Sequence, residues 1–395
     1  MNHMLLKVIF SDLVRVVTFP IRMLPVKKSR ILFTGLTGGN GYDYSCNPKY
    51  IFEYLRDTCP GRFEYVWTVS DKERYSFLKE EGVKIVKHFT VSSFIMLLTS
   101  RVVITNGSYV PWFPFRRKQY VINTWHGGGA YKKVEIETGK LDWAAKRMAA
   151  FCAGNINLFV ASCKEQERQM IRGTYQYEGD VLKAGTPRND KLVRGETADM
   201  IKKVKERYKI SEHARIVLYA PTYRYAVSPV ILEADGLLER LEQDGSKWFF
   251  LCRYHRYQKT GMNIHVEGRR IIDVADYPDM QELLAAADLL ITDYSSCVWD
   301  YALLDRKCIL YVPDRKEYTE KTGFYVDLER WPFCKTENMQ ELLETVEILQ
   351  RDEEQEEILK ARVREHLKEL GSYETGNSRE MIADKIKEQV QPIVR

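Results

Sequence analysis

The stretch "DLLITDYSSCVWDYALLDRKCILYV" (residues 288–312) decides the fold class of this chain. Its apolar ends, DLLITDY and KCILYV, are typical of buried strands, and the segment SSCVWDYALLD between them is typical of a helix. Two strands that are joined through a helix run parallel in one sheet, and helices then cover both faces of that sheet. The stretch therefore predicts an α/β protein with a doubly wound parallel sheet.

The same alternation runs through most of the chain. From Arg30 onward short apolar strands alternate with helices, and the alternation restarts near Ala214. A chain of 395 residues is too long for one ordinary core. We therefore expect two Rossmann-like domains, residues 30–200 and 201–375, facing a cleft, and a C-terminal helix in residues 376–395 that braces both.

The composition excludes several classes of protein. Hydrophobic residues make up 45% and charged residues 29% of the chain, which is typical of globular proteins. The eight cysteines are scattered without a CxxC pair, and the seven histidines show no metal-binding spacing. This pattern indicates a reduced, cytosolic protein without a disulfide framework or a zinc site. We predict no cofactor and no metal site, and any weaker need for a divalent metal stays open.

The N-terminal segment, residues 1–29, differs from the rest. Its apolar stretch at residues 5–24 is interrupted by charges, so it is unsuited to span a membrane. Polar residues recur on one helical stripe, and Pro20 is expected to end the helix. This pattern predicts an amphipathic helix in the membrane interface. The alternatives are an amphipathic helix packed on the protein's own core and a signal peptide, although no small-residue cleavage site follows.

The net charge supports a membrane surface as the partner. Residues 1–30 carry six basic residues against Asp12 alone, so this segment accounts for the whole net charge of +5. A basic segment on a formally neutral body favours a local anionic partner and argues against a nucleic-acid footprint across the surface. We therefore expect an anionic membrane as a partner and no nucleic acid.

The stretch "VINTWHGGGAYKK" (residues 121–133) places His126 and three glycines directly after a predicted strand. Ligands bind at the carboxyl ends of the strands in doubly wound sheets. A histidine at such an edge is a candidate proton acceptor near neutral pH, and the glycines allow backbone to lie close to a ligand. The alternative is a flexible turn with an incidental histidine.

Further unusual residues follow strands in the second half. Ser295 and Ser296 begin a helix, where hydroxyls and free N–H groups bind phosphate; the alternative is a plain N-cap. Arg224 offers a guanidinium suited to phosphate, and His255 lies between two arginines, where an anion would favour its charged form. Arg188 is expected either to reach across the cleft or to pair with an acid.

Six ordered motifs carry a family resemblance, namely NTWHG, GTPRND, YAPTYR, RYHR, ADLLITDYSSCVWDYALLDRKCILYVPD and TGFYVDL. Together with NPKYIFEYL near the start, they resemble the CDP-glycerol glycerophosphotransferase family of teichoic acid and related polymer synthesis. The resemblance covers about residues 30–385. It implies a GT-B fold and a peripheral protein at the cytoplasmic face of the cell membrane.

The resemblance also implies roles for individual residues. His126 would be the general base that takes the proton of the acceptor hydroxyl, and His255 would be a second catalytic residue that holds the pyrophosphate of the donor. Asp300 would position the ribose or glycerol end. The residues implied to bind the donor are Arg188, Thr222, Arg224, Asp293, Ser295, Ser296 and Asp300.

The implied reaction is the transfer of glycerol phosphate or ribitol phosphate from a CDP-activated donor to a lipid-linked acceptor, with release of CMP. The family commonly has His-Gly-Thr-Pro where this chain has "HGGG" (residues 126–129), so we expect the glycines to open space for a different substrate. The alternative functions are a GT-B glycosyltransferase that uses a nucleotide sugar and a nucleotide-binding scaffold without activity. The acceptor, the choice between priming and polymerising, and a homo-oligomeric state stay open.

Overall fold

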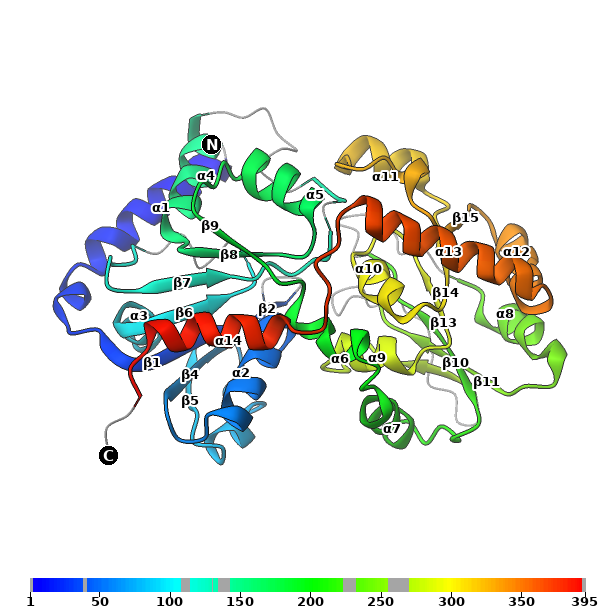
Figure 1. Ribbon diagram of the computed structural model, residues 1–395, viewed down its shortest axis with the longest axis horizontal. Coiled ribbons are helices and arrows are strands. Elements are labelled where there is room, and N and C mark those ends of the chain that lie inside the picture. The colour runs from blue at the N-terminus through cyan, green and yellow to red at the C-terminus, as the bar shows by residue number, and fades with distance from the viewer. Residues whose placement is uncertain are drawn as a thin grey trace. The chain divides into compact units, whose positions relative to one another are not determined.

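The computed structural model of the chain describes residues 3–37, 41–107, 114–129, 131–133, 143–222, 232–254 and 270–392. The chain divides into two units, one made of Met1–Asp190 with Ser372–Arg395 and the other of Lys191–Gly371 (Figure 1). Each unit contains a parallel sheet with helices packed on it. The prediction of an α/β protein with two parallel-sheet domains is confirmed.

The first unit is built on a sheet of seven parallel strands in the order β5-β4-β1-β6-β7-β8-β9. A separate antiparallel pair, β2 and β3, follows β1. The strands of this unit are β1 (Lys27–Thr34), β2 (Leu36–Thr37), β3 (Gly41–Tyr42), β4 (Glu64–Val69), β5 (Lys84–Lys87), β6 (Ser100–Thr105), β7 (Tyr120–Asn123), β8 (Leu158–Ala161) and β9 (Asp180–Lys183). Its helical segments are α1 (His3–Val17), η1 (Pro20–Met23), α2 (Cys46–Thr58), η2 (Ser76–Lys79), α3 (Val91–Thr99), α4 (Trp143–Asn155), α5 (Lys164–Gln166), η4 (Glu167–Thr174), η5 (Pro187–Asn189) and α14 (Ser378–Gln389).

The second unit is built on a sheet of six parallel strands in the order β12-β11-β10-β13-β14-β15. Its strands are β10 (Arg215–Tyr219), β11 (Trp248–Cys252), β12 (Ile271–Asp273), β13 (Leu289–Thr292), β14 (Lys307–Tyr311) and β15 (Cys334–Thr336). Its helical segments are α7 (Ala198–Arg207), α8 (Ala234–Leu241), η6 (Glu242–Asp244), α9 (Met280–Ala286), α10 (Cys297–Tyr301), η7 (Ala302–Leu304), α11 (Arg315–Thr322), η8 (Leu328–Arg330), α12 (Met339–Arg351) and α13 (Glu353–Glu369). The short helix α6 (Asp190–Val193) begins at the boundary between the units.

Both sheets have the same winding. In each, the first strand lies inside the sheet, the chain moves outward to one edge, and it then crosses back to build the other half. The order therefore reverses between β1 and β6 in the first unit and between β10 and β13 in the second. The crevice outside the carboxyl ends of these strand pairs is where ligands bind in doubly wound sheets.

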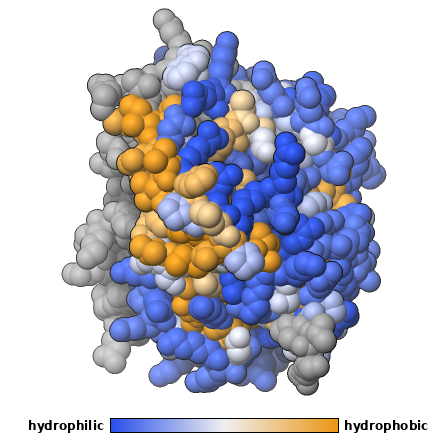
Figure 2. Space-filling model, turned by 90° about the vertical axis from the view of Figure 1, so that its left-hand side faces the viewer, coloured by the Kyte–Doolittle hydropathy of each residue, from blue (hydrophilic) through white to orange (hydrophobic). Residues whose placement is uncertain are grey.

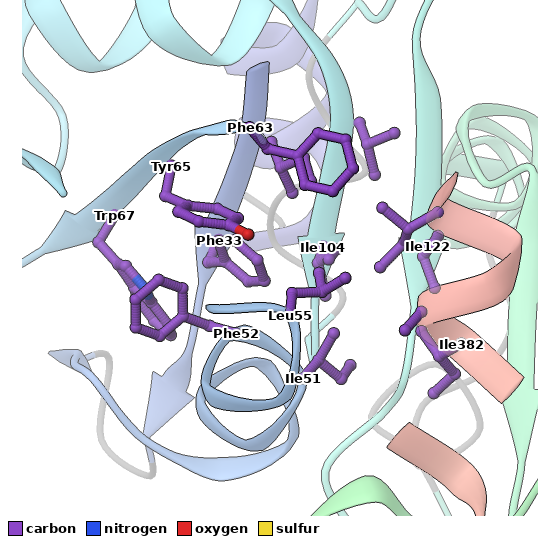
Figure 3. Packing of buried hydrophobic residues seen from close by; sticks show 14 of the residues in the cluster. Phe33, Ile51, Phe52, Leu55, Phe63, Tyr65, Trp67, Ile104, Ile122 and Ile382 are labelled. Atoms are coloured by element: carbon purple, nitrogen blue, oxygen red, sulfur yellow. The ribbon is translucent and has the colours of Figure 1, made fainter. Parts of the chain in front are cut away.

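The core of the first unit forms where α2 packs on β1 and β4 (Figure 3). Phe33 of β1 stacks on Trp67 of β4 with ring centroids 5.4 Å apart, and Phe52 of α2 meets both rings edge-on. Aromatic pairs prefer these offset and edge-on arrangements. All three side chains are fully buried, as expected for a parallel strand that helices cover on both faces.

The helix α14 completes this core. Its residues Ile382, Ala383 and Ile386 are fully buried in the same cluster as Phe33 (Figure 3). The carboxylate of Asp190 accepts hydrogen bonds from the backbone N–H groups of Ser378 (3.0 Å) and Arg379 (2.8 Å) and from the Nε of Arg379 (3.0 Å).

The two units differ from the expected domains in where the chain divides. The chain divides after Asp190 rather than after residue 200, and residues 372–395 belong to the first unit; the expectation that residues 376–395 brace both domains stays a prediction. The buried carboxylate of Asp190 anchors the start of α14 to the first unit. Burial raises the pKa of Asp190, and the donors from Ser378 and Arg379 oppose that rise.

The N-terminal helix α1 lies with its polar side chains turned toward the protein. Ser11 is 4% exposed, Asp12 pairs with Arg147 of α4 at 2.8 Å, and the guanidinium of Arg15 lies 3.8 Å from the ring centre of Phe151. As predicted, the helix ends before Pro20, which begins η1.

Many apolar side chains of α1 and η1 face outward, although Val8 is buried and Val14 packs on the core. Figure 2 shows the outward-facing ones within a band of apolar surface on that side of the molecule. The large hydrophobic residues exposed in these two elements and beside them are Leu6, Ile9, Phe10, Leu13, Val16, Val17, Phe19, Met23 and Leu24. Among the helices of the described residues, none combines the length and the apolar character needed to cross a bilayer.

Replacing Asp190 with alanine is expected to lower the free energy of unfolding by about 3 kcal/mol, because Arg379 and two N–H groups of α14 lose a buried acceptor. Urea-induced unfolding measures this change. The matched control is Asp384→Ala on the same helix, since Asp384 is mostly exposed and pairs with Lys387 at the surface. The control is expected to change stability by less than about 0.5 kcal/mol. Equal effects of the two substitutions would contradict the anchoring role.

Candidate active site

The reversal of strand order in the first unit is marked by a buried asparagine, Asn106, directly after β6. Its side chain accepts a hydrogen bond from the N–H of Leu36 at 2.7 Å and donates one to the carbonyl of Leu36 at 3.0 Å. These two bonds join the loop after β6 to β2, the short strand that follows β1. Asn106 was missed from the sequence, although an Asn-Gly pair after an apolar strand is a recognisable turn signal.

The predicted base, His126, lies beside this point. Its Nδ1 lies 2.9 Å from the carbonyl oxygen of Asn106. A carbonyl can only accept a hydrogen bond, so Nδ1 carries a proton, and in the neutral form of the ring Nε2 carries the lone pair. The ring of Trp125 lies against the imidazole with centroids 4.6 Å apart, and the His126 side chain is exposed to solvent. The geometry therefore makes Nε2 the basic nitrogen of the neutral imidazole.

The electrostatic surroundings favour the same protonation state. The pKa of His126 is lowered from its ordinary value, first because surrounding protein displaces water from the ring, although part of the side chain remains exposed. The positive charges of Arg188 and Lys132 lower the pKa further, and the hydrogen bond to Asn106 opposes the shift. His126 is therefore unprotonated at neutral pH, as a general base must be.

The third glycine after His126, Gly129, has a structural role. Gly129 has φ +67°, and a Cβ at this position would lie 2.1 Å from Cε2 of Tyr131. Its N–H donates to Oγ of Ser162 at 2.9 Å. The third glycine is therefore required by the turn and by the close approach of Tyr131. The expectation that the glycines open space for substrate stays a prediction.

Arg188, which we expected either to reach across the cleft or to pair with an acid, is buried within the first unit. Its side chain is 6% exposed, and its Nη1 donates to the carbonyl oxygen of His126 at 2.6 Å. The structure thus brings Arg188 and His126 together, through the backbone of the histidine. The role of Arg188 in donor binding stays a prediction.

The reversal of strand order in the second unit is marked by Thr222 and Asp293. Thr222 follows β10 and Asp293 follows β13, the two strands between which the order reverses. One carboxylate oxygen of Asp293, a residue 1% exposed, accepts hydrogen bonds from the N–H (2.8 Å) and the hydroxyl (2.6 Å) of Thr222. The two predicted donor-binding residues therefore hold each other in place at this edge.

The two serines precede a short helix, α10, which continues as η7. Oγ of Ser295 accepts a long hydrogen bond, 3.4 Å, from the N–H of Cys297. Ser296 occupies the N-cap position in helical conformation and makes no side-chain capping bond. A plain N-cap thus accounts for neither serine, because Ser295 precedes the N-cap position and Ser296 makes no capping bond; phosphate binding by the pair stays a prediction.

The remaining predicted residues have different settings. Asp300 is 1% exposed, and its carboxylate accepts a hydrogen bond from Nε2 of Gln281 at 3.0 Å. Arg224 and His255 lie outside the described residues. Within the described parts of the chain, no group of three or more His, Cys, Asp or Glu side chains is arranged to hold a metal ion.

Comparisons with known proteins agree on one family. A family model for CDP-glycerol:poly(glycerophosphate) glycerophosphotransferases matches residues 17–388. The chain is 28% identical over 348 residues to the teichoic acid poly(glycerol phosphate) polymerase of Bacillus spizizenii, covering 82% of this chain and 86% of that protein. It is 27% identical over 342 residues to the teichoic acid glycerol-phosphate transferase of Staphylococcus aureus, covering 82% and 85%.

The fold agrees as well. The solved structure of the wall teichoic acid polymerase TagF superposes with a TM-score of 0.79, at 21% identity, over 98% of this chain and 97% of that chain. The likeness in structure shows the shared fold, and the family model extends over nearly the whole sequence. The chain therefore belongs to the CDP-glycerol:poly(glycerophosphate) glycerophosphotransferase family.

Proposed function

We propose that this protein transfers glycerol phosphate or ribitol phosphate from a CDP-activated polyol to a hydroxyl group of a lipid-linked acceptor and releases CMP. The observation that carries the proposal is the state of His126, a neutral histidine whose Nδ1 proton is directed to the Asn106 carbonyl. Family membership supports polyol-phosphate transfer as the class of reaction. Teichoic acid or capsular polymer synthesis is the setting that we propose for it.

The proposed step is an in-line displacement at the distal phosphorus of the donor. The acceptor hydroxyl forms the new O–P bond while Nε2 of His126 takes its proton. The bond between the distal phosphorus and the bridging oxygen breaks, and CMP leaves with that oxygen. Phosphoryl transfer of this kind depends mainly on positioning and on stabilising charge, which suits a rigidly held base.

We propose that the donor binds at the second unit. The tie between Thr222 and Asp293 fixes the two loops that follow β10 and β13, where a nucleotide is expected in a doubly wound sheet. Ser295 and Ser296 would contact the pyrophosphate, and Arg224 and His255 keep the same proposed role by motif. Asp300 keeps its proposed place near the ribose or glycerol end.

We also propose that the two units adopt the GT-B arrangement and that α1 attaches the protein to the cytoplasmic face of the membrane. The exposed apolar face of α1 and η1 supports attachment, since it includes Val16 at 72% and Met23 at 79% exposure. An apolar helix face beside basic residues is what an interfacial helix requires. A membrane-bound enzyme is also suited to a lipid-linked acceptor.

Replacing His126 with alanine is expected to lower the rate of CMP release about 100- to 10,000-fold, the usual range for loss of a general base. The measurement follows CMP, CDP, UMP and UDP from CDP-glycerol, CDP-ribitol and a panel of UDP-sugars with a lipid-linked acceptor extract. The control, His213→Ala, alters an exposed histidine between α7 and β10 and is expected to leave the rate unchanged. Release of UDP from a UDP-sugar by the wild type would instead identify a glycosyltransferase.

The rate is expected to depend on pH through His126. Since the base acts only when unprotonated, kcat/KM should rise with pH and level off above the pKa of His126. That pKa is lowered, so the midpoint of the rise is expected below about 6.5, the ordinary value for histidine. A pH–rate profile of the wild type, corrected for stability at each pH, measures it. A midpoint above the ordinary value would contradict this assignment.

Replacing Leu13 and Val16 together with aspartate is expected to weaken binding to vesicles that contain anionic lipid by at least about tenfold, because two apolar side chains become charged. Vesicle co-sedimentation measures the binding. Ile348→Asp on α12 is the matched control, because Ile348 is an exposed apolar residue of a surface helix in the second unit. Equal binding of wild type and double variant would show that α1 does not attach the protein.

A further inference from the structure

The loop that carries His126 is held in an unusual way. Four successive backbone carbonyls, from Thr124 to Gly127, each accept a hydrogen bond from a side chain of another segment. Most backbone carbonyls in folded proteins are paired within helices or sheets. Here the chain has left β7, so buried polar side chains replace the ladder. The donors to these carbonyls are Asn47, Arg188 and Gln166.

Asn47 binds two of the four carbonyls at once. Its Nδ2 donates to the oxygen of Thr124 at 3.2 Å and to that of Trp125 at 2.9 Å. Its Oδ1 accepts from the backbone N–H of Arg188 at 3.2 Å, which fixes the orientation of the amide. Asn47 is fully buried in the first turn of α2 and belongs to the NPKY motif, for which the proposed reaction provides no role.

Arg188 binds the next carbonyl along the chain. Its Nη1 donates to the oxygen of His126 at 2.6 Å and also contacts Sγ of Cys46 at 3.0 Å. Asn47 and Arg188 are therefore linked to each other as well as to three consecutive carbonyls. Two segments that are distant in sequence, the start of α2 and η5, meet at the backbone of one loop.

The backbone at this point needs such support. Trp125 has φ +53°, in the left-handed region of backbone conformation that residues other than glycine rarely adopt. The two carbonyls that Asn47 binds belong to the peptide groups on either side of Trp125, so they fix its conformation. The backbone turn at Trp125 then directs the imidazole of His126 toward the carbonyl oxygen of Asn106.

We propose that Asn47 and Arg188 are positioning residues for the proposed reaction, holding residues 124–126 in the conformation that presents Nε2 of His126 to the acceptor hydroxyl. Neither residue needs to touch the substrate for this role. The inference rests on the proposed function and assigns a task to two sequence motifs, NPKY and GTPRND. It also accounts for the burial of Arg188 beside the backbone of His126.

The test compares Asn47→Ala and Arg188→Gln with the wild type. Each variant is expected to lower kcat for CMP release by about 100-fold and to leave KM for the CDP-polyol within about twofold, since displacing a reacting group by 1 Å has costs of this size. Arg188→Lys keeps the charge and one donor, so it is expected to recover part of kcat. A donor-binding role would instead raise KM.

Two control variants separate positioning from general loss of stability. Asn155→Ala removes an asparagine that donates to the carbonyl of Phe151 at 3.1 Å, and Arg101→Gln removes an arginine that donates to the carbonyl of Gln389 at 2.7 Å. Both lie in the first unit and bind carbonyls, but neither contacts the loop of His126. Both are expected to retain the kcat of the wild type.

Amide hydrogen exchange provides a readout that does not depend on activity. In Asn47→Ala and Arg188→Gln, exchange at residues 124–129 is expected to accelerate at least about tenfold, while β8 keeps its protection. The proposal would be overturned if both variants exchanged loop amides at the rate of the wild type. A raised KM with unchanged kcat would also overturn it. If the wild type turns over no CDP-polyol, the proposed function fails, and exchange alone decides whether the two residues hold the loop.

Discussion

The pairing of β1 with β6 sets the position of Asn106, whose carbonyl oxygen holds the imidazole of His126. The chain builds outward from β1 to one edge and then returns to start the other half at β6. The loops after these two strands diverge, and Asn106 spans them. The carbonyl of Asn106 then fixes the proton on Nδ1 of His126. A change in strand order would separate these groups, so the tautomer of one histidine depends on the topology of the sheet.

The second unit uses the same winding for a different purpose. Its polar link joins the ends of β10 and β13 through Asp293 and Thr222, and the carboxylate is buried. A buried carboxylate that accepts two hydrogen bonds stiffens the loops around it, whereas an unpaired one would be costly. One unit thus holds a basic nitrogen in place and the other holds two loops in place.

The sequence was sufficient to predict the strands because parallel strands covered on both faces are apolar throughout, as in Ile31 to Phe33. It was also sufficient to place His126, Thr222 and Asp293 after strands. It did not reveal that residues 372–395 belong to the first unit, because the carboxylate of Asp190 binds residues 188 and 189 positions further along the chain. The contacts of Asn47 and Arg188 with backbone carbonyls were hidden for the same reason. A side chain that binds a backbone carbonyl can pair with a residue of any type. The sequence of the partner segment therefore carries no recognisable pattern.

The placement of α14 has a consequence for the order in which the protein is made. The first unit consists of two separate stretches of chain, and the whole second unit is inserted between them. During synthesis, the β-strands of the first unit leave the ribosome long before Ile382 and Ile386, which fill its core. The second unit can complete its own core earlier, since all of its chain precedes α14. The nascent first unit therefore carries an open apolar surface over α2 and β6 until residues 378–389 emerge, and it is the unit that finishes folding last.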